Sequence, residues 1–482
     1  MGVSSSTYEL TEVGEATWEL PASARPDMRV PLRVFADEEL LQPILRDRSL
    51  VQLENVATLP GIVGAALGMP DMHQGYGFPV GAVAATEMPD GVISPGGVGY
   101  DINCGVRLLA LPLQADGLGD RRERLVHEIA RTVPAGTGKH GGLHPGAAAF
   151  ERVLTWGPRV LVEELGIGTR EDVECTESQG CIAGADPAAL SQRALARGGS
   201  QLGTLGSGNH FLELQRVDVV HDPVAADAFG LAQGQATILI HSGSRGLGHQ
   251  VCSDYVRLME QVGRRYGIDL PDRQLACAPF SSPEGQAYFA AMAAAANFAF
   301  ANRHAMTHLI REAIRRILGA AVADGTRQVY DVAHNIAKLE RHDGRELCVQ
   351  RKGATRAFPA ESEEIPTAYR AVGQPVFIPG SMGTSSFVLA GEPGAMERSF
   401  GTTCHGAGRR LSRTAAKKQV TGAQLRRELS EQGIVVRCPS NSGLAEEAPF
   451  AYKDVERVVA VVEQAGLARR VAQLRPLGVV KG

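Results

Sequence analysis

The fold is indicated most directly by the segment Thr237-Ile238-Leu239-Ile240-His241-Ser242-Gly243. A threonine and three consecutive apolar residues form a β-type run that predicts a buried strand, and the polar and glycine residues after it predict a turn. The same order occurs at Val329-Tyr330-Asp331-Val332-Ala333-His334-Asn335 and at Pro375-Val376-Phe377-Ile378-Pro379-Gly380-Ser381. Ligand sites in proteins that combine helices with sheets commonly lie where strands end. We therefore expect a functional site at these three turns.

Helices and loops are expected around these strands. Residues 121–131 predict a helix. Ser282-Pro283 is a typical helix start, and a long alanine-rich helix should follow toward Leu318, with Asn302 as one place where it could break. Residues 61–105 look rich in loops and residues 135–200 look irregular. No repeat or linker is visible, so we expect one intertwined catalytic domain over residues 1–482.

Composition excludes several classes of protein. The chain has 482 residues, of which 44% are hydrophobic and 21% charged, as in ordinary globular proteins. Its 56 glycines suggest many tight loops, and its net charge of −4 argues against a general polyanion binder. Eight scattered cysteines without a CxxC pair indicate a reducing compartment. Without a secretory signal or an apolar stretch of membrane-spanning length, a cytoplasmic protein with no membrane association is expected.

A metal site is one reading of five scattered residues. The candidate ligands are Asp101, Cys104, His210, His241 and His334. One carboxylate, one thiolate and three imidazoles suit Mn²⁺, Zn²⁺ or Co²⁺ better than Mg²⁺, and a thiolate can bridge two ions. The alternative is a small buried cysteine with hydrogen-bonded histidines. Glycine-flanked positions at strand ends favour the metal, although no HxxxH or CxxC spacing is present.

Phosphate chemistry is indicated by two glycine-rich loops and a histidine. Residues 203–208 and 243–248 could expose backbone N–H groups to phosphate, although tight turns explain them equally well. Arg245 lies in the second loop, and a guanidinium suits phosphate oxygens. His405 is surrounded by small residues, which leave room for a bulky group on its ring, as a covalent nucleophile requires. An ordinary loop histidine is the alternative.

A basic run surrounds this histidine. No acidic residue falls among its eight members, so they suggest a track for a polyanion, although a solvated helix face is the alternative. The members are Arg398, Arg409, Arg410, Arg413, Lys417, Lys418, Arg426 and Arg427.

The segment 211–214 alternates like a strand and suggests a base pocket. Phe211 and Glu213 would share one face, where the ring could stack on guanine and the carboxylate could accept its N1–H and N2–H. Lys481 could meet the O6 acceptor, and adenine would be refused. An ordinary amphipathic strand is the alternative.

From about Met28 to Gly482 the sequence resembles the RtcB-type RNA ligases. The motifs that carry the resemblance, in order, are Asp71-Met72-His73-Gln74-Gly75-Tyr76-Gly77-Phe78-Pro79, Asp101-Ile102-Asn103-Cys104-Gly105, Gly208-Asn209-His210-Phe211-Leu212-Glu213, His241-Ser242-Gly243-Ser244-Arg245-Gly246, Ala333-His334-Asn335, Arg351-Lys352-Gly353-Ala354-Thr355-Arg356, Pro379-Gly380-Ser381-Met382-Gly383-Thr384, Cys404-His405-Gly406-Ala407-Gly408-Arg409 and Leu474-Arg475-Pro476-Leu477-Gly478-Val479-Val480-Lys481-Gly482.

The resemblance implies an α+β fold with mixed sheets and helices around a central metal cleft. It also implies a reaction that joins RNA ending in a 3′-phosphate or 2′,3′-cyclic phosphate to RNA with a 5′-hydroxyl. GTP would be the cofactor and two Mn²⁺ the usual ions, with Zn²⁺ or Co²⁺ as substitutes. His405 would carry GMP as a phosphoramidate, the RNA 3′-phosphate would take the guanylyl group, and attack by the 5′-hydroxyl would release GMP.

Residue roles follow from the same resemblance. Asp101, Cys104 and His210 would hold one ion, and Cys104, His241 and His334 the other. Asn209 and Asn335 would contact phosphate oxygens, while Arg245 and the basic run near Arg409 would hold RNA. The guanine pocket would comprise Phe211, Glu213, Ser381, Ser386, Tyr452 and Lys481. The nucleotide site would also include His334, Met382, His405, Gly406, Ala407 and Gly408. A neutral His405 requires an acceptor for its other ring N–H.

Two other functions stay open from the residues alone. A dinuclear metal phosphoesterase would use the same ions without a covalent nucleotide step. A non-catalytic RNA-binding protein would use a structural metal. The sequence leaves open whether the RNA substrates are tRNA halves or damaged RNA, and whether an activating protein of the archease type takes part.

Overall fold

An eight-stranded, mainly antiparallel sheet carries most of the segments singled out above. The computed structural model describes residues 9–136, 138 and 140–482. Along the sheet the order is β11-β7-β9-β8-β19-β16-β15, and β18 pairs with β19 in parallel. The strands are β11 (Arg327–Ala333), β7 (Gly105–Gln114), β9 (Gln235–Ser242), β8 (Phe211–Val220), β19 (Ala468–Lys481), β16 (Ser386–Gly391), β15 (Pro375–Ile378) and β18 (Val435–Arg437).

A second sheet has seven strands in the order β1-β2-β3-β4-β5-β13-β12. They are β1 (Thr11–Gly14), β2 (Thr17–Leu20), β3 (Leu32–Phe35), β4 (Ile62–His73), β5 (Val80–Glu87), β13 (Arg345–Lys352) and β12 (Asn335–His342). Two small sheets pair β6 (Val92–Ile93) with β10 (Ala278–Pro279), and β14 (Ala354–Arg356) with β17 (Thr402–Cys404). Because β12 follows β11 directly, the chain passes from one large sheet to the other at His334.

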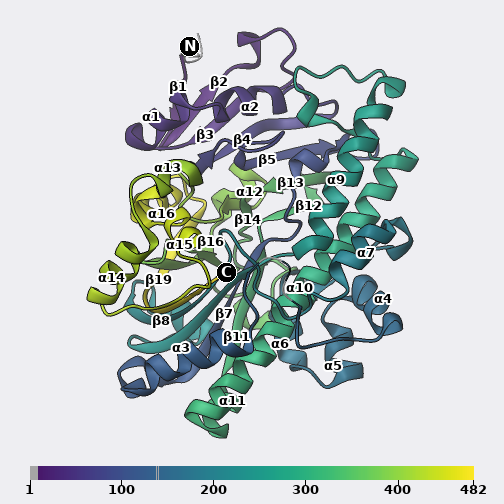
Figure 1. Cartoon of the computed structure of the whole chain (residues 1–482). Coiled ribbons are helices and arrows are strands. Elements are labelled where there is room, and N and C mark those ends of the chain that lie inside the picture. Colours follow the sequence, from purple (N-terminus) through teal and green to yellow (C-terminus); the bar gives the residue numbers. More distant parts are fainter. Residues whose placement is uncertain (1–8, 137, 139) are drawn as a thin grey trace.

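Helices flank both sheets (Figure 1). The helices of the first half are α1 (Glu38–Arg46), α2 (Ser49–Val56), α3 (Arg121–Thr132), α4 (Ala147–Trp156), α5 (Arg159–Leu165), α6 (Arg170–Glu174), α7 (Gln192–Gly198) and α8 (Pro223–Phe229). Those of the second half are α9 (Arg245–Val262), α10 (Pro283–Leu318), α11 (Ala320–Gly325), α12 (Pro393–Ser399), α13 (Arg413–Lys417), α14 (Gly422–Glu431), α15 (Asn441–Glu446) and α16 (Val455–Gln464). In Figure 1 the seven-stranded sheet lies at the top, α9 and α10 run down one side, and α13 to α16 lie on the other.

Helix α10 is the longest helix and begins where the sequence predicts. The Ser282 hydroxyl accepts a hydrogen bond from the Gly285 N–H at 3.1 Å, and Pro283 occupies the first helical turn. The predicted break at Asn302 is wrong. Instead of bonding to its own helix, the Asn302 amide oxygen accepts from the Gly203 and Thr204 N–H groups at 2.8 and 3.1 Å. Alanine side chains let neighbouring helices approach closely, and α10 packs against α3, α4 and α9.

Two other sequence expectations need correction. Residues 61–105, predicted to be rich in loops, contain the long strands β4 and β5, because their many glycines and alanines form buried sheet interior. Residues 135–200, predicted to be irregular, contain the short helices α4 to α7, several of which have capped ends, such as the capping box between Thr169 and Asp172. Short helices of this kind depend on caps and packing, so their hydrophobic periodicity is weak.

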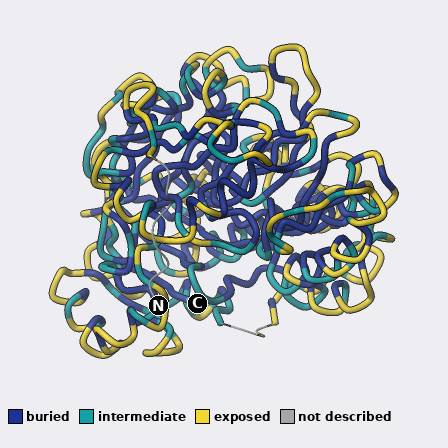
Figure 2. Tube along the Cα trace, turned by 90° about the horizontal axis from the view of Figure 1, so that it is seen from above, coloured by how far each residue is buried: buried dark blue, intermediate teal, exposed yellow. Residues whose placement is uncertain are grey.

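The α+β class predicted from the sequence is confirmed. Helix α3 matches the helix predicted over 121–131, and the strands expected before His334 and Pro379 are β11 and β15, whereas β9 extends two residues past the expected turn and includes His241. Figure 2 shows buried backbone through the interior and exposed backbone mainly on outer loops. Among the described residues, no helix is both long and apolar enough to cross a membrane.

Candidate active site and metal centre

One edge of the eight-stranded sheet gathers four of the predicted metal ligands. Cys104 directly precedes β7 and His210 directly precedes β8, whereas His241 lies near the end of β9 and His334 directly follows β11. The strands β11, β7, β9 and β8 are neighbours in this order and each pair is antiparallel, so the starts of β7 and β8 lie beside the ends of β9 and β11. Segments more than a hundred residues apart in the sequence therefore meet at one place.

The pairing register sets this meeting to within one residue. Gly105 lies opposite both Ser242 and Ala333, and Phe211 lies opposite His241. A slip of one residue would turn a ligand to the other face of the sheet, because side chains alternate along a strand. The close packing around Gly105 restricts such movement, since a Cβ on this glycine would lie 2.2 Å from the Val332 carbonyl oxygen.

The side chains converge into two groups that share Cys104. One group is Asp101, Cys104 and His210, and the other is Cys104, His241 and His334; within each, the ligand atoms lie within 4.8 Å of one another. The Cys104 Sγ atom is 3.5 Å from His210 Nε2 and 3.2 Å from His241 Nε2. The Asp101 carboxylate lies 2.7 Å from His210 Nε2, and the Nε2 atoms of His241 and His334 are 3.2 Å apart. This arrangement fits two ions that share one thiolate.

Burial decides the protonation of these groups. It lowers the pKa of His241 and His334 well below the ordinary value, so both rings are neutral and offer lone pairs. It raises the pKa of the Cys104 thiol, so an ion must displace a proton to bind there. Burial also opposes ionisation of Asp101, but His210 and Arg245 outweigh it and lower the pKa of Asp101 to about 2. The donor set is therefore suited to divalent cations.

His405 lies against the second group and has a buried partner. Its ring centroid is 5.0 Å from that of His334. The Asp71 carboxylate, which is fully buried, lies 2.5 Å from His405 Nδ1 and accepts from the backbone N–H groups of His405 and Gly406 at 3.1 and 3.3 Å. This is the acceptor that a neutral, oriented histidine requires. It leaves the Nε2 lone pair of His405 for chemistry.

Two buried lysines stabilise the end of strand β4, which carries Asp71, and the loop that follows it. The Lys453 ammonium donates to the carbonyl oxygens of Pro70 and Met72 at 3.1 and 2.7 Å. The Lys352 ammonium donates to the Phe78 carbonyl oxygen at 3.0 Å and also contacts that of Tyr76. Burial lowers the pKa of each lysine to about 8. Sequence reasoning gave Asp71 no role, although it opens one of the family motifs.

A cavity of about 680 Å³ lies in front of His405 and the metal groups. Most residues predicted for the nucleotide and RNA line it. They are Asn209, Phe211, His334, Asn335, Ser381, Met382, His405, Gly406, Ala407, Gly408, Arg409, Arg410, Arg413, Tyr452 and Lys481. Three others, Glu213, Ser386 and Arg245, are not among the lining residues.

The predicted guanine pocket is placed partly behind the cavity wall. Lys481 Nζ lies 5.3 Å from the centre of the Phe211 ring, and both line the cavity. Glu213 is buried, and Gln215 Nε2 donates to its carboxylate at 2.5 Å and to the Ser386 hydroxyl at 3.1 Å. Burial raises the pKa of Glu213 to about 8, so this group is largely protonated near neutral pH and accepts two hydrogen bonds as a carboxylate only when donors placed against it lower that pKa. Sequence reasoning missed Gln215, for which the period of strand β8 was the only signal.

Arg245 contacts His210, one of the candidate metal ligands, and does not line the cavity. Its Nη1 atom lies 3.2 Å from His210 Nδ1, and its Nε donates to the Thr204 hydroxyl at 3.3 Å. Asn335 also has local partners, because it donates to the Asp101 carbonyl oxygen at 3.0 Å and accepts from the Gly353 N–H at 2.8 Å. In this structure both side chains stabilise the loops that carry the ligands.

The basic run does not form the continuous track predicted from the sequence. Helix α15 brings Glu446 and Glu447 against it, and Glu447 pairs with Arg409 and Arg413 at 3.0 Å each. Lys417 pairs with Glu446 at 2.8 Å. Burial opposes ionisation of Glu447, but Lys481 and Arg409 outweigh it and lower its pKa to about 2. Acidic residues distant in sequence thus neutralise much of this charge, which a local scan of the sequence does not detect.

The arginines at the ends of the basic run lie apart from its centre. Arg398 on α12 donates to the Ala465 carbonyl oxygen at 2.9 Å, and Arg426 on α14 donates to that of Val436 at 3.0 Å. Arg409 lies over the Tyr452 ring, 5.0 Å from its centre, at the cavity wall. Only the part of the run near Arg409 and Arg413 therefore faces the candidate site.

Comparison with known proteins agrees with this geometry. A family model described as tRNA-splicing ligase RtcB matches residues 52–482. The chain belongs to the RtcB family. It is 52% identical to the tRNA-splicing ligase RtcB of Thermococcus kodakarensis over 478 residues, which cover 98% of this chain and 99% of that protein. It is 50% identical over 478 residues to the protein of that name from Archaeoglobus fulgidus, again with 98% and 99% covered.

A bacterial relative gives a similar match. The RNA-splicing ligase RtcB of Mycobacterium tuberculosis is 54% identical over 439 residues, which cover 90% of this chain and all of that protein. The resemblance drawn from the sequence motifs is therefore confirmed over nearly the whole chain.

Substitution of the shared ligand tests the two-group arrangement. We expect Cys104→Ala to lose both ions together, because Cys104 belongs to both groups. His210→Ala should weaken binding of the ion held by the first group more than binding of the ion held by the second, because His210 belongs only to the first. Metal content after dialysis against Mn²⁺ or Co²⁺ measures this. Retention of one ion at full affinity by Cys104→Ala would contradict a bridging thiolate.

Proposed function

We propose that this protein is an RNA ligase that joins 3′-phosphate or 2′,3′-cyclic phosphate ends to 5′-hydroxyl ends, using GTP and two Mn²⁺. The observation that carries the proposal is the placement of His405. It is held by a buried carboxylate, it lines the cavity, and it lies against a pair of ligand groups. Family membership supports RNA as the substrate, since the relatives are named tRNA-splicing or RNA-splicing ligases.

The residues present fit a pair of divalent cations. A thiol, a carboxylate and three neutral imidazoles are the donors that Mn²⁺, Zn²⁺ and Co²⁺ accept, and Cys104 is common to both groups. When bound, such ions polarise phosphorus and neutralise the charge of phosphate oxygens. The protein's own contribution is to hold the donors in a buried place, with the imidazoles already neutral.

His405 is the proposed nucleophile. With Nδ1–H donated to Asp71, the Nε2 lone pair attacks the α-phosphorus of GTP. The N–P bond forms as the bond from phosphorus to the bridging oxygen of pyrophosphate breaks, and pyrophosphate leaves. Asp71 stabilises the positive charge that develops on the ring, as a carboxylate does for a catalytic imidazole.

Two further transfers complete the proposed ligation. An oxygen of the RNA 3′-phosphate attacks the phosphorus on His405, so the N–P bond breaks and His405 regains its lone pair. The 5′-hydroxyl then attacks the RNA 3′-phosphorus, loses its proton to solvent and displaces GMP. A cyclic phosphate is first hydrolysed to the 3′-phosphate. Arg409, Arg410 and Arg413 line the cavity and are the groups proposed to hold the RNA phosphates.

Guanine selection is assigned to the end of the cavity near Lys481. Phe211 and Lys481 are opposite each other in the β8–β19 pair, and Glu213 lies on the same face of β8. Ser381, Met382 and Tyr452 complete the lining there, with Ser386 behind it. The reaction is assigned to the cytoplasm, because the eight cysteines are all free, as expected of a reducing compartment.

An activating protein of the archease type is a proposed partner.

One assay separates this proposal from its rivals. We expect protein incubated with α-labelled GTP and Mn²⁺ to carry acid-labile, hydroxylamine-sensitive label, and to seal a 2′,3′-cyclic-phosphate RNA to a 5′-hydroxyl RNA. His405→Ala should lose label and sealing but keep its metal. A metal phosphoesterase would open the cyclic phosphate without label, and a non-catalytic RNA-binding protein would do neither. Label retained on His405→Ala would show that the nucleophile is another residue.

Asp71→Asn tests the orientation of His405. We expect guanylylation to fall by about 10³-fold to 10⁴-fold, because an amide in place of the carboxylate no longer fixes the tautomer or stabilises the imidazolium. Stopped-time labelling with GTP measures the rate. Metal content and the thermal unfolding temperature serve as controls, and both should stay near those of the unsubstituted protein. An unchanged labelling rate would remove Asp71 from the mechanism.

Glu213→Gln tests base selection. We expect ATP to fail where GTP labels the protein, and Glu213→Gln to reduce labelling by GTP by about 10-fold to 100-fold, because a primary amide pairs poorly with two adjacent donors. Labelling by the two nucleotides at equal concentrations gives the ratio. If both nucleotides label the unsubstituted protein equally, Glu213 does not read the guanine edge.

A further inference from the structure

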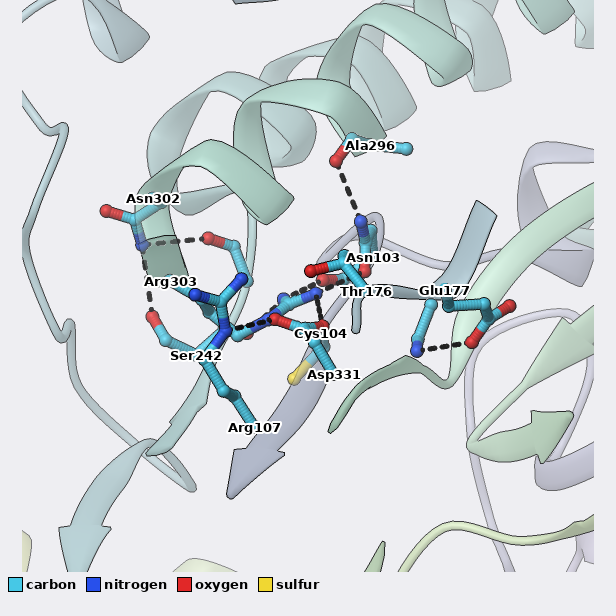
Figure 3. Close-up of polar contacts among 12 residues, drawn as sticks. Asn103, Cys104, Arg107, Thr176, Glu177, Ser242, Ala296, Asn302, Arg303 and Asp331 are labelled. Carbon is cyan, nitrogen blue, oxygen red and sulfur yellow. Dashed lines mark hydrogen bonds and ion pairs between the residues drawn. The ribbon is translucent and has the colours of Figure 1, made fainter. Parts of the chain in front are cut away.

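Three charged side chains are completely buried behind the metal groups. Arg107 on β7, Arg303 on α10 and Asp331 on β11 each have no exposed side-chain surface. Arg107 Nε donates to the Asp331 carboxylate at 2.6 Å, and Arg303 Nη2 donates to it at 2.7 Å. Figure 3 shows Arg303 reaching from α10 to this carboxylate, with Cys104 beside them. Burial of so much charge is costly unless every group is paired, so this cluster calls for an explanation.

Every N–H of the Arg303 guanidinium has an acceptor. Nε donates to Asp331 at 2.9 Å, and Nη1 donates to the carbonyl oxygens of Asn103 and Ser242 at 2.8 Å each. Nη2 donates to Asp331 and, at 3.0 Å, to the side-chain oxygen of Asn103. Arginine alone offers five donors in one plane, whereas lysine offers three from a single atom.

The acceptors belong to the three segments that deliver the second ligand group. Asn103 directly precedes Cys104, and Ser242 directly follows His241. Asp331 lies three residues before His334 on the strand that ends at it. A single planar group is therefore bonded to the backbone beside Cys104 and His241, and to a side chain on the strand that ends at His334.

Helix α10 holds the Cys104 turn at a second point. Asn103 has a positive φ of 49°, and its amide donates to the Ala296 carbonyl oxygen at 2.7 Å. A left-handed residue costs free energy unless local hydrogen bonds support it, which Asn103 obtains from α10 on both sides of its amide group. Gly105 completes the fit, because a Cβ there would lie 2.9 Å from Arg303 Nη2.

We propose that Arg303 is the positioning residue that sets the mutual placement of Cys104, His241 and His334. It touches none of the reacting groups, and it acts through the backbone of Asn103 and Ser242 and through the carboxylate of Asp331. The inference rests on the proposed function in one respect, which is that these three side chains bind a cation. It adds that the geometry of the bridging thiolate depends on one side chain of a helix outside the sheet.

The same helix offers a matched control in Arg311. It is partly buried and donates twice to the buried carboxylate of Asp172, at 2.5 and 2.8 Å, and its remaining bonds go to the Thr326 carbonyl oxygen. None of these partners adjoins a ligand. Arg303→Lys and Arg311→Lys therefore each remove guanidinium contacts with a buried carboxylate, but only the first changes the support of the metal group.

Titration of the full-length protein with Co²⁺ tests the proposal. We expect Arg303→Lys to bind Co²⁺ on the order of 10-fold to 100-fold more weakly and to show an altered thiolate-to-cobalt charge-transfer band. Arg311→Lys should match the unsubstituted protein in Co²⁺ affinity and in the band, although both variants are expected to lose thermal stability. A purely structural role for Arg303 would change stability and leave the band and the affinity alone.

The outcomes separate the inference from the proposed function. If Arg303→Lys binds Co²⁺ with unchanged affinity and an unchanged band, Arg303 is not the positioning residue, and the metal site itself stands. If the unsubstituted protein gives no thiolate-to-cobalt band, the proposed metal centre fails and the inference fails with it. Should Arg303→Lys not fold, Asp331→Asn, which keeps the size of the side chain, is measured in the same way with the same expected loss.

Discussion

The structure depends on holding a thiol and several imidazoles within contact distance of one another in a buried place. Such groups do not attract one another strongly when no cation is present, so their proximity has to be imposed by the rest of the fold. Antiparallel pairing of β7 with β9 and β11, and of β8 with β9, imposes it, because the register fixes which residues share the sheet edge. The backbone hydrogen bonds of the sheet thus stabilise an arrangement that the ligand side chains alone would not favour.

Buried charge supports this arrangement from behind. Arg107, Arg303 and Asp331 lie behind the metal groups, Lys453 holds the end of strand β4 that carries Asp71, and Lys352 holds the loop after that strand. Replacing such groups with apolar side chains would often stabilise a protein. Their presence here is best explained by specificity, since Arg303 and Lys453 donate to carbonyl oxygens of residues that adjoin Cys104, His241 and Asp71 and so fix the position of the chain there.

The cavity combines these two systems. His405 is oriented by Asp71 from one large sheet, and its ring lies against His334, where the chain passes to that sheet from the other. The cations of Arg409 and Arg413 face the cavity but are partly neutralised by Glu447. The cationic groups at the cavity are therefore local and partly balanced and do not form a continuous basic track, which agrees with a net charge of −4 for the whole chain.

The sequence by itself determined the residues of the site and much of the local structure. Polar residues at the ends of apolar runs identified His241 and His334, a capping serine placed the start of α10, and the small neighbours of His405 indicated a nucleophile. Ordered motifs identified the family, because many local matches in one order are specific even when each alone is weak.

Only the tertiary structure decided which distant residues meet. Asp71, Glu447 and Arg303 have no local pattern that marks their roles, since these come from partners far away along the chain, such as His405 for Asp71. The basic run looked unopposed for the same reason. Contacts of this kind depend on strand order and register, which local periodicity does not encode. The sequence therefore identifies most of the chemical groups of the site, whereas the fold determines their geometry and the charged groups with which they pair.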